Sequence, residues 1–417
     1  LSAPERLSHL AMLSGEGGAS ADRAHLLRLC ERLGVAAPPA GATHVFQECG
    51  AFRLKWERHA EFCSWTFIVE GGIVEGEFAD PFAPPALAAV PADWLAGLPG
   101  QRLVATHVAF VPANSSSSTP EALARTFDPD TLAASRLANG GADVWTDFRL
   151  HADGFGRILV QDRALARRRQ AGRMVQRLLE IETYRLLALL ALPQAREIGP
   201  LLTTIDGELG RIVESIRDTA GLGERPEEER RLLGRLLDLA AEIERMSATS
   251  HYRFGAARAY YALVERRIRE LREARVEEGT QTIGEFMERR LAPAMRTCLA
   301  TSERLGAMAE RLVRAGTLLR TRVEIALEAQ NQAVLASMDR RARMQLRLQQ
   351  TVEGLSVVAI TYYAVGLLGY ALAGLEAAGL VVRHALWTGI AVPAGAGLTW
   401  SAMRRVRRAI TKPETPA

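Results

Sequence analysis

The pattern of apolar and polar positions changes character along the chain. In the first part, short runs rich in Val, Phe, Trp and Thr are separated by Gly, Pro and Ser clusters. These runs predict strands at His44–Cys49, Ala51–Trp56, Ser64–Glu70 and Leu103–Val111. Helical spacing between them predicts helices over Ala21–Leu33 and Pro120–Thr126. We therefore expect an α+β cytoplasmic domain over residues 1–162.

After residue 162 the pattern changes to long stretches of Leu, Ala, Arg and Glu with helical spacing. A helical domain is expected over residues 163–254. It consists of helices at about 164–192, stopped by Pro193, at 195–218 and at 227–254. A long helical region follows over 255–354, with Gly279, Gly284 and Pro293 as its strongest breakers.

The end of that region keeps a heptad-like track. Polar Asn331, Arg341 and Gln345 are inserted among its apolar members Leu327, Val334, Met338, Leu348, Val352 and Leu355. Such a track is typical of a coiled coil or stalk helix with polar layers. A lone helix packed on its own domain is the alternative.

Two uncharged stretches follow. Leu355–Leu375 holds 21 residues and Ala385–Met403 holds 19, neither with an Asp, Glu, Lys, Arg or His. About 20 such residues cross the hydrocarbon layer of a bilayer, so a transmembrane hairpin is predicted over residues 355–403. Pro393 and several glycines make the second span the weaker one, although lipid-buried helices tolerate both. A hairpin buried in soluble protein is the alternative.

Basic residues flank this hairpin on both outer sides and indicate its orientation. Arg383 is the sole Lys or Arg of the link, whereas the flanks hold Arg340, Arg341, Arg343 and Arg347 before it and Arg404, Arg405, Arg407, Arg408 and Lys412 after it. By the positive-inside rule, both termini and the basic tail 404–417 lie in the cytoplasm. The expected location is therefore a membrane, with the lipid bilayer as one partner.

Composition adds little about chemistry. The 52 basic and 48 acidic residues nearly balance to a net charge of +4, which does not indicate a nucleic-acid partner. The four cysteines form no CxxC pair and no metal-ligand spacing, so we expect reduced thiols and no cofactor. Arg6 and His9 interrupt the first residues, which therefore lack the uncharged core of a signal peptide.

The richest polar cluster lies at residues 55–61. If this segment is extended, Glu57, His59 and Glu61 share one face with Lys55 and offer weak candidate ligands for a divalent cation, or an acid/base pair. A solvated strand face with cross-strand ion pairs is the favoured alternative. No catalytic constellation is found, so an enzyme is not expected.

Three other features have simpler interpretations. Gly154 and Gly156 lack a phosphate-loop frame and predict a hairpin turn through Asp153 and Gly154. A basic helix face is expected to be solvated or paired with Glu180, or to meet phosphates or acidic lipid; it comprises Arg167, Arg168, Arg169, Arg173 and Arg177. Glu180 and Tyr184 share a helix face, which a buried inter-helix hydrogen bond would explain.

Three stretches carry a family resemblance. They are FRLKWERHAEFCSWTF (Phe52–Phe67), RMVQRLLEIETYRLLALLALPQAREI (Arg173–Ile198) and MQLRLQQTVEGLSVVAITYYAVGLLGY (Met344–Tyr370). The chain resembles the bacterial membrane-anchored family called domain of unknown function 3422. This resemblance implies a C-terminal inner-membrane anchor and no established activity, so it assigns no functional residues.

Two functions remain open. The first is a membrane-anchored scaffold or interaction protein, a homo-oligomer through its stalk and hairpin. The second rests on a layout similar to that of CorA-type divalent cation channels, in which Ser356, Thr361, Tyr362 and Tyr363 would line a pore. The Gly-Met-Asn signature of those channels is absent, with Gly369 and Tyr370 in its place.

Overall fold

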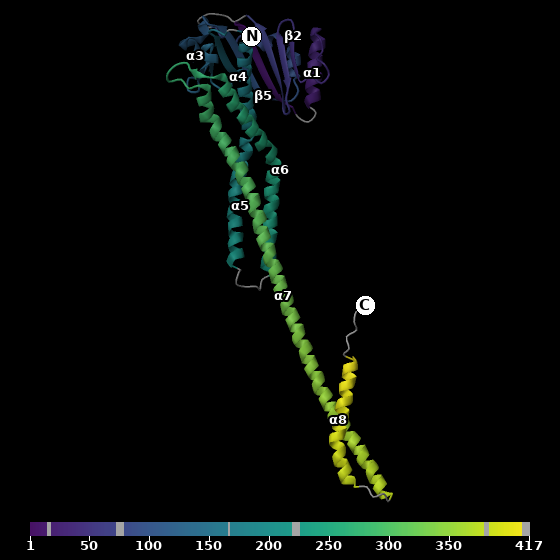
Figure 1. The fold of residues 1–417 in the computed structure, drawn as a ribbon. Coiled ribbons are helices and arrows are strands. Elements are labelled where there is room, and N and C mark those ends of the chain that lie inside the picture. The colour runs from purple at the N-terminus through teal and green to yellow at the C-terminus, as the bar shows by residue number, and fades with distance from the viewer. Residues whose placement is uncertain (15–17, 72–78, 166, 219–225, 379–382, 411–417) are drawn as a thin grey trace. The chain divides into compact units, whose positions relative to one another are not determined.

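The computed structural model describes residues 1–14, 18–71, 79–165, 167–218, 226–378 and 383–410. Contacts divide the chain into two compact units, Leu1–Thr317 and Leu318–Ala417. The first holds a mixed sheet and several helices, and the second is helical (Figure 1). The predicted basic residue Lys412 lies outside the described residues.

Within the described residues, nine strands form one sheet in the order β2-β3-β4-β1-β5-β8-β7-β6-β9. β5 and β8 pair in parallel, and the other neighbours are antiparallel. The strands are β1 (Glu5–Leu13), β2 (His44–Glu48), β3 (Arg53–Arg58), β4 (Phe62–Glu70), β5 (Gln101–Pro112), β6 (Ala133–Leu137), β7 (Ala142–Thr146), β8 (Gly156–Asp162) and β9 (Ala274–Arg275). All four strands predicted from the pattern are present.

The central strand β1 is one that the pattern does not predict. It pairs with β4 on one side and β5 on the other, and both its faces are buried. Polar Arg6, Ser8 and His9 break its apolar run, but each has a hydrogen-bond partner elsewhere in the fold. A buried polar side chain is tolerated in a strand when it is paired in this way.

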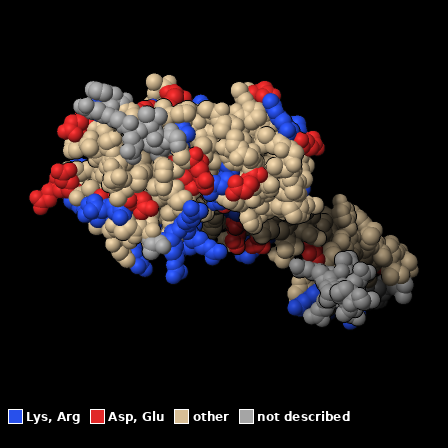
Figure 2. Space-filling view, turned by 90° about the horizontal axis from the view of Figure 1, so that it is seen from above, with Lys and Arg blue, Asp and Glu red and all other residues tan. Residues whose placement is uncertain are grey.

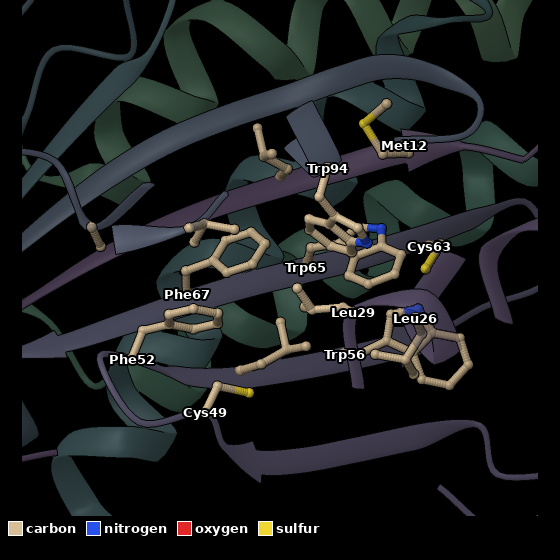
Figure 3. Packing of buried hydrophobic residues seen from close by; sticks show 14 of the residues in the cluster. Met12, Leu26, Leu29, Cys49, Phe52, Trp56, Cys63, Trp65, Phe67 and Trp94 are labelled. Carbon is tan, nitrogen blue, oxygen red and sulfur yellow. The ribbon is translucent and has the colours of Figure 1, made fainter. Parts of the chain in front are cut away.

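One face of the sheet packs against α1 (Gly18–Leu33) and the short α2 (Ala92–Ala96). Figure 3 shows the aromatic side chains of this core, where Trp65 meets Trp94 edge to face at 5.3 Å between ring centroids. Leu26, Leu29 and Cys30 of α1 complete it. Beyond it, α3 (Pro120–Thr126) is capped by Thr119, whose hydroxyl accepts a hydrogen bond from the Ala122 amide at 3.3 Å.

The opposite face packs against α4 (Arg168–Leu189), which contacts β5 and α6 (Pro226–Leu271). Next in the chain is α5 (Leu192–Asp218), which runs beside α6 (Figure 1). The predicted helix boundary at Phe254 is wrong, because α6 continues through Gly255 to Leu271. Gly255 itself has open space around it. A glycine weakens a helix without ending it.

The real break lies at residues 272–282, just before α7 (Ile283–Ala377). Thr282 and Glu285 form a capping box there: the Glu285 carboxylate accepts from the Thr282 amide at 2.9 Å, and the Thr282 hydroxyl accepts from the Glu285 amide at 3.2 Å. α7 then runs for 95 residues through Pro293. Gly284 and Pro293 therefore do not interrupt it.

The second unit contains the C-terminal part of α7 and α8 (His384–Ile410). The two helices touch where a Cβ on Gly395 would lie 3.6 Å from side-chain carbons of Thr361 and Val365. Close to this contact, the hydroxyl oxygens of Thr361 and Thr399 are 3.5 Å apart. A small residue at this position allows the close approach of two helices.

Candidate binding site

A cavity of about 340 Å³ lies between α4 and the half of the sheet formed by β1 to β4. Its strand residues follow the sheet register: His9 is opposite Thr66, Thr66 is opposite Lys55, and Lys55 is opposite Phe46. Its helical wall is one face of α4, at Arg169, Gly172, Arg173, Val175, Gln176, Leu179, Glu180, Thr183 and Tyr184. These residues recur at helical spacing, which places them on one side of α4.

His9 forms a buried hydrogen-bonded chain across the floor of the cavity. The Thr183 hydroxyl donates to the Leu179 carbonyl at 2.8 Å, so its oxygen accepts from His9 Nε2 at 3.3 Å. The Thr66 hydroxyl in turn donates to His9 Nδ1 at 2.8 Å. Burial is the main cause that lowers the pKa of His9 to about 3, and Lys55 and His59 lower it further. His9 is therefore neutral, with its proton on Nε2.

Most charges at the cavity are already paired. Lys55 Nζ lies 2.8 Å from Glu57 Oε2, and Arg53 Nη2 lies 2.6 Å from the buried Glu5 Oε1. Glu180 accepts from Arg267 of α6 and, at 2.8 Å, from Gln176 Nε2. Among the described residues, Arg169 and Arg173 of the lining have no ion-pair partner. The cavity thus has a surplus of positive charge at α4.

The three candidate ligands from the sequence have separate partners. Glu57 pairs with Lys55, and the His59 ring stacks on Phe62 with 4.1 Å between centroids. Glu61 contacts α6, where its Oε2 accepts from Arg253 Nη1 at 3.3 Å and from the Tyr260 hydroxyl at 3.1 Å. Within the described residues no group of three or more His, Cys, Asp or Glu is placed to hold a metal ion. Glu57 and His59 nevertheless border the cavity, which Glu61 does not.

The Glu180–Tyr184 face joins α4 to α6, as its spacing predicts. Tyr184 stacks on Tyr260 with 5.7 Å between ring centroids, while Glu180 pairs with Arg267. Burial and the nearby Glu180 raise the pKa of Tyr184 to about 12, so its hydroxyl stays protonated. On the basic face of α4, however, Arg177 does not pair with the expected Glu180. It pairs with Glu270 of α6 at 3.0 Å.

A second polar cluster resembles a catalytic triad in composition only. Ser8 Oγ lies 2.8 Å from His107 Nδ1, and His107 Nε2 lies 3.9 Å from Asp153 Oδ2. Burial lowers the pKa of His107 to about 4, and Phe155 stacks on its ring at 4.0 Å. Ser8 is fully buried in the central strand, so its hydroxyl is not accessible to a substrate. The predicted turn lies next to it: Gly154 has φ +76° between the antiparallel strands β7 and β8.

Among the described helices, α7 alone is long and apolar enough to cross a membrane. Only 6% of its most apolar 18-residue stretch is buried. The hydroxyls of Ser356 and Thr361 bond to carbonyls of their own helix at 2.9 and 2.7 Å. Thr361 is buried against α8, whereas Tyr362 and Tyr363 are exposed.

The sequence also matches a known family along most of its length. A family described as "Protein of unknown function (DUF3422)" covers residues 1–410. The chain belongs to the DUF3422 family. The resemblance carried by the three motifs is therefore confirmed, and the DUF3422 match spans both units. No curated protein and no solved structure matches the chain.

Proposed function

We propose that this DUF3422 protein is a membrane-anchored interaction protein of a bacterial inner membrane. The observation that carries the proposal is the exposure of Leu355–Leu375, which is helical, uncharged and scarcely buried. Burying one large aliphatic side chain contributes about 1.5–3 kcal/mol. Leu355, Val358 and Leu367 are each at least 66% exposed. In a bilayer, acyl chains would replace water around these side chains and remove the free-energy cost of their exposure.

The proposal extends to α8 as a second span. Its Gly395 packs against α7 at Thr361 and Val365, and Arg404 lies over the Trp400 ring at 4.9 Å near the end of the uncharged stretch. Indole rings favour the headgroup level of a bilayer. With basic residues before the first span and after the second, both ends of the hairpin face the cytoplasm.

We further propose that two copies associate in parallel through α7. The positions from Leu327 to Leu355 alternate steps of four and three residues without interruption, and all of them are exposed. In this register Asn331 occupies an a position, where a buried Asn favours two-stranded parallel coiled coils. A second copy of the same helix supplies the matching Asn.

The packing of Thr361 on α8 favours this function over a CorA-like channel, since that hydroxyl does not point away from its own hairpin. The mass of the detergent-solubilised protein distinguishes the interaction protein from the channel. Two subunits support the interaction protein, and a closed ring of three or more supports the channel.

Cell fractionation tests the anchor. The full chain is expected in the membrane pellet after an alkaline carbonate wash and in solution only after detergent. A reporter fused after Ala417 is expected to be active in the cytoplasm. Recovery of monodisperse protein from the detergent-free supernatant would contradict the proposal.

A further inference from the structure

We propose that the cavity beneath α4 binds a small amphiphilic carboxylate, an organic acid anion with an apolar and partly aromatic body. This site is independent of the membrane anchor. It lies wholly within the first unit, between two elements of the sheet domain that contact each other directly. Its volume of about 340 Å³ falls at the lower end of the range for small-molecule pockets.

The body of the ligand is defined by apolar side chains on both walls. Leu7, Phe62 and Ile68 line the cavity from the strand side, and Val175 and Leu179 line it from α4. The Phe62 ring is itself held between His59, with which it stacks, and Tyr184, which it meets edge to face at 6.5 Å. Such a lining favours a flat or branched hydrocarbon body over a sugar or a hydrated ion.

The charge of the ligand follows from the ion pairs. Both acidic residues of the lining are neutralised, Glu57 by Lys55 and Glu180 by Arg267. Arg169 and Arg173 are left with no ion-pair partner among the described residues. The planar guanidinium group matches a carboxylate in two-point hydrogen bonding. A ligand with one carboxylate therefore complements this end of the cavity.

Gly172 is the position of the lining at which a larger side chain would fill the cavity. It lies between Arg169 and Arg173 on the cavity wall, and a Cβ built on it would meet no atom within 4 Å. A side chain at position 172 would occupy the space beside the two arginines. Because Gly172 is helical and has no close neighbour, a larger residue there fills the site without disturbing the packing of α4.

The test measures binding of 2-naphthoate to the full chain in lipid nanodiscs by equilibrium dialysis, with empty nanodiscs as the blank. We expect saturable binding of one anion per chain. The neutral analogue 2-naphthalenemethanol is expected to bind at least about tenfold more weakly, because it lacks the charge that the arginines complement.

Three variants test the location. Gly172→Leu fills the cavity and Arg173→Gln removes one cation, so each is expected to weaken 2-naphthoate binding about tenfold or more. Gly207→Leu is the matched control, since Gly207 is also a helical glycine with open space around it, on α5 and outside the cavity lining. It is expected to bind as the unchanged protein does. Arg173 is exposed, so its variant reports on the site even if Gly172→Leu fails to fold.

Three results would overturn the proposal. The first is the absence of saturable binding above empty nanodiscs. The second is equal affinity for the alcohol and the carboxylate. The third is unchanged affinity in folded Gly172→Leu and in Arg173→Gln.

Discussion

His9 shows how a single buried residue links two layers of the fold. It joins β4 through Thr66 and α4 through Thr183, and burial keeps its imidazole neutral. A histidine in an unfolded chain has a pKa near 6.5. Acidification from pH 7 to 5.5 therefore protonates His9 in the unfolded state while the folded state resists protonation until its pKa of about 3.

The first prediction concerns this linkage. Because only the unfolded chain gains the proton, His9 lowers stability by up to about 1.4 kcal/mol per pH unit below 6.5. His9→Gln removes this contribution and is expected to show a smaller fall in melting temperature between pH 7 and pH 5.5. Tryptophan fluorescence of the core around Trp65 and Trp94 reports the melting. An identical fall in both proteins would contradict the assignment.

Gly284 supports a second prediction at this scale. A Cβ there would lie 2.3 Å from Glu273 Oε1. That carboxylate accepts from the Gly284 amide and the Thr282 hydroxyl, both at 3.0 Å, and from the Ser135 hydroxyl at 2.8 Å. Gly284→Ala is expected to destabilise the protein by about 1–3 kcal/mol, because the displaced carboxylate loses these bonds.

Gly306 is the matched control on the same helix. It is exposed, with open space around it, so Gly306→Ala is expected to stabilise the protein by about 0.5–1 kcal/mol. Calorimetric melting of both variants compares them directly. Equal shifts in the same direction would contradict the role of Glu273.

Single residues also explain why the sequence does not predict β1. The polar residues Arg6, Ser8 and His9 interrupt its apolar pattern. They are tolerated because they bond to Pro84, His107 and Thr66, which lie far along the chain and cannot be recognised as partners from the sequence. The cavity is hidden for the same reason. Its strand side is visible in the alternation of Lys55 and Glu57, but its other wall belongs to a helix more than 100 residues later.

At the scale of elements, local signals predict most of the described helices but only four of the nine described strands, β2 to β5. The capping box Thr282–Glu285 is present in the sequence and marks the true start of α7, whereas α6 continues through Gly255 and α7 through Pro293. The buried side chains Met287, Leu291 and Met295 hold α7 in the first unit on either side of Pro293. Isolated breakers are thus weaker evidence for a boundary than a complete cap.

The exposed track on α7 gives the third prediction. Met338 occupies an a position of the proposed two-stranded coil, and Leu346 occupies an outward b position; they are 60% and 56% exposed. Oxidation of Met338→Cys is expected to yield a disulfide-linked dimer, and Leu346→Cys is expected to yield far less. The four native cysteines are buried and do not compete. Equal cross-linking at both positions would contradict the parallel pairing.

At the scale of the whole molecule, charged side chains and exposed large apolar side chains gather in different parts of the chain. Figure 2 shows acidic and basic side chains interspersed on the face that it presents. The second unit instead exposes large apolar residues along α7 and α8, among them Leu367, Tyr370 and Leu398. Its composition already predicts a membrane segment, whereas the cavity of the first unit depends on contacts between distant parts of the chain that no local pattern encodes.

The most direct measurement of the central claim is the environment of Leu367, in the middle of the proposed first span and 70% exposed. A nitroxide label on Leu367→Cys in liposomes is expected to collide readily with oxygen and rarely with a water-soluble nickel chelate. The same label on Leu346→Cys, ahead of the span, is expected to show the reverse. Equal access of the nickel chelate to both labels would contradict the placement of Leu355–Leu375 in lipid.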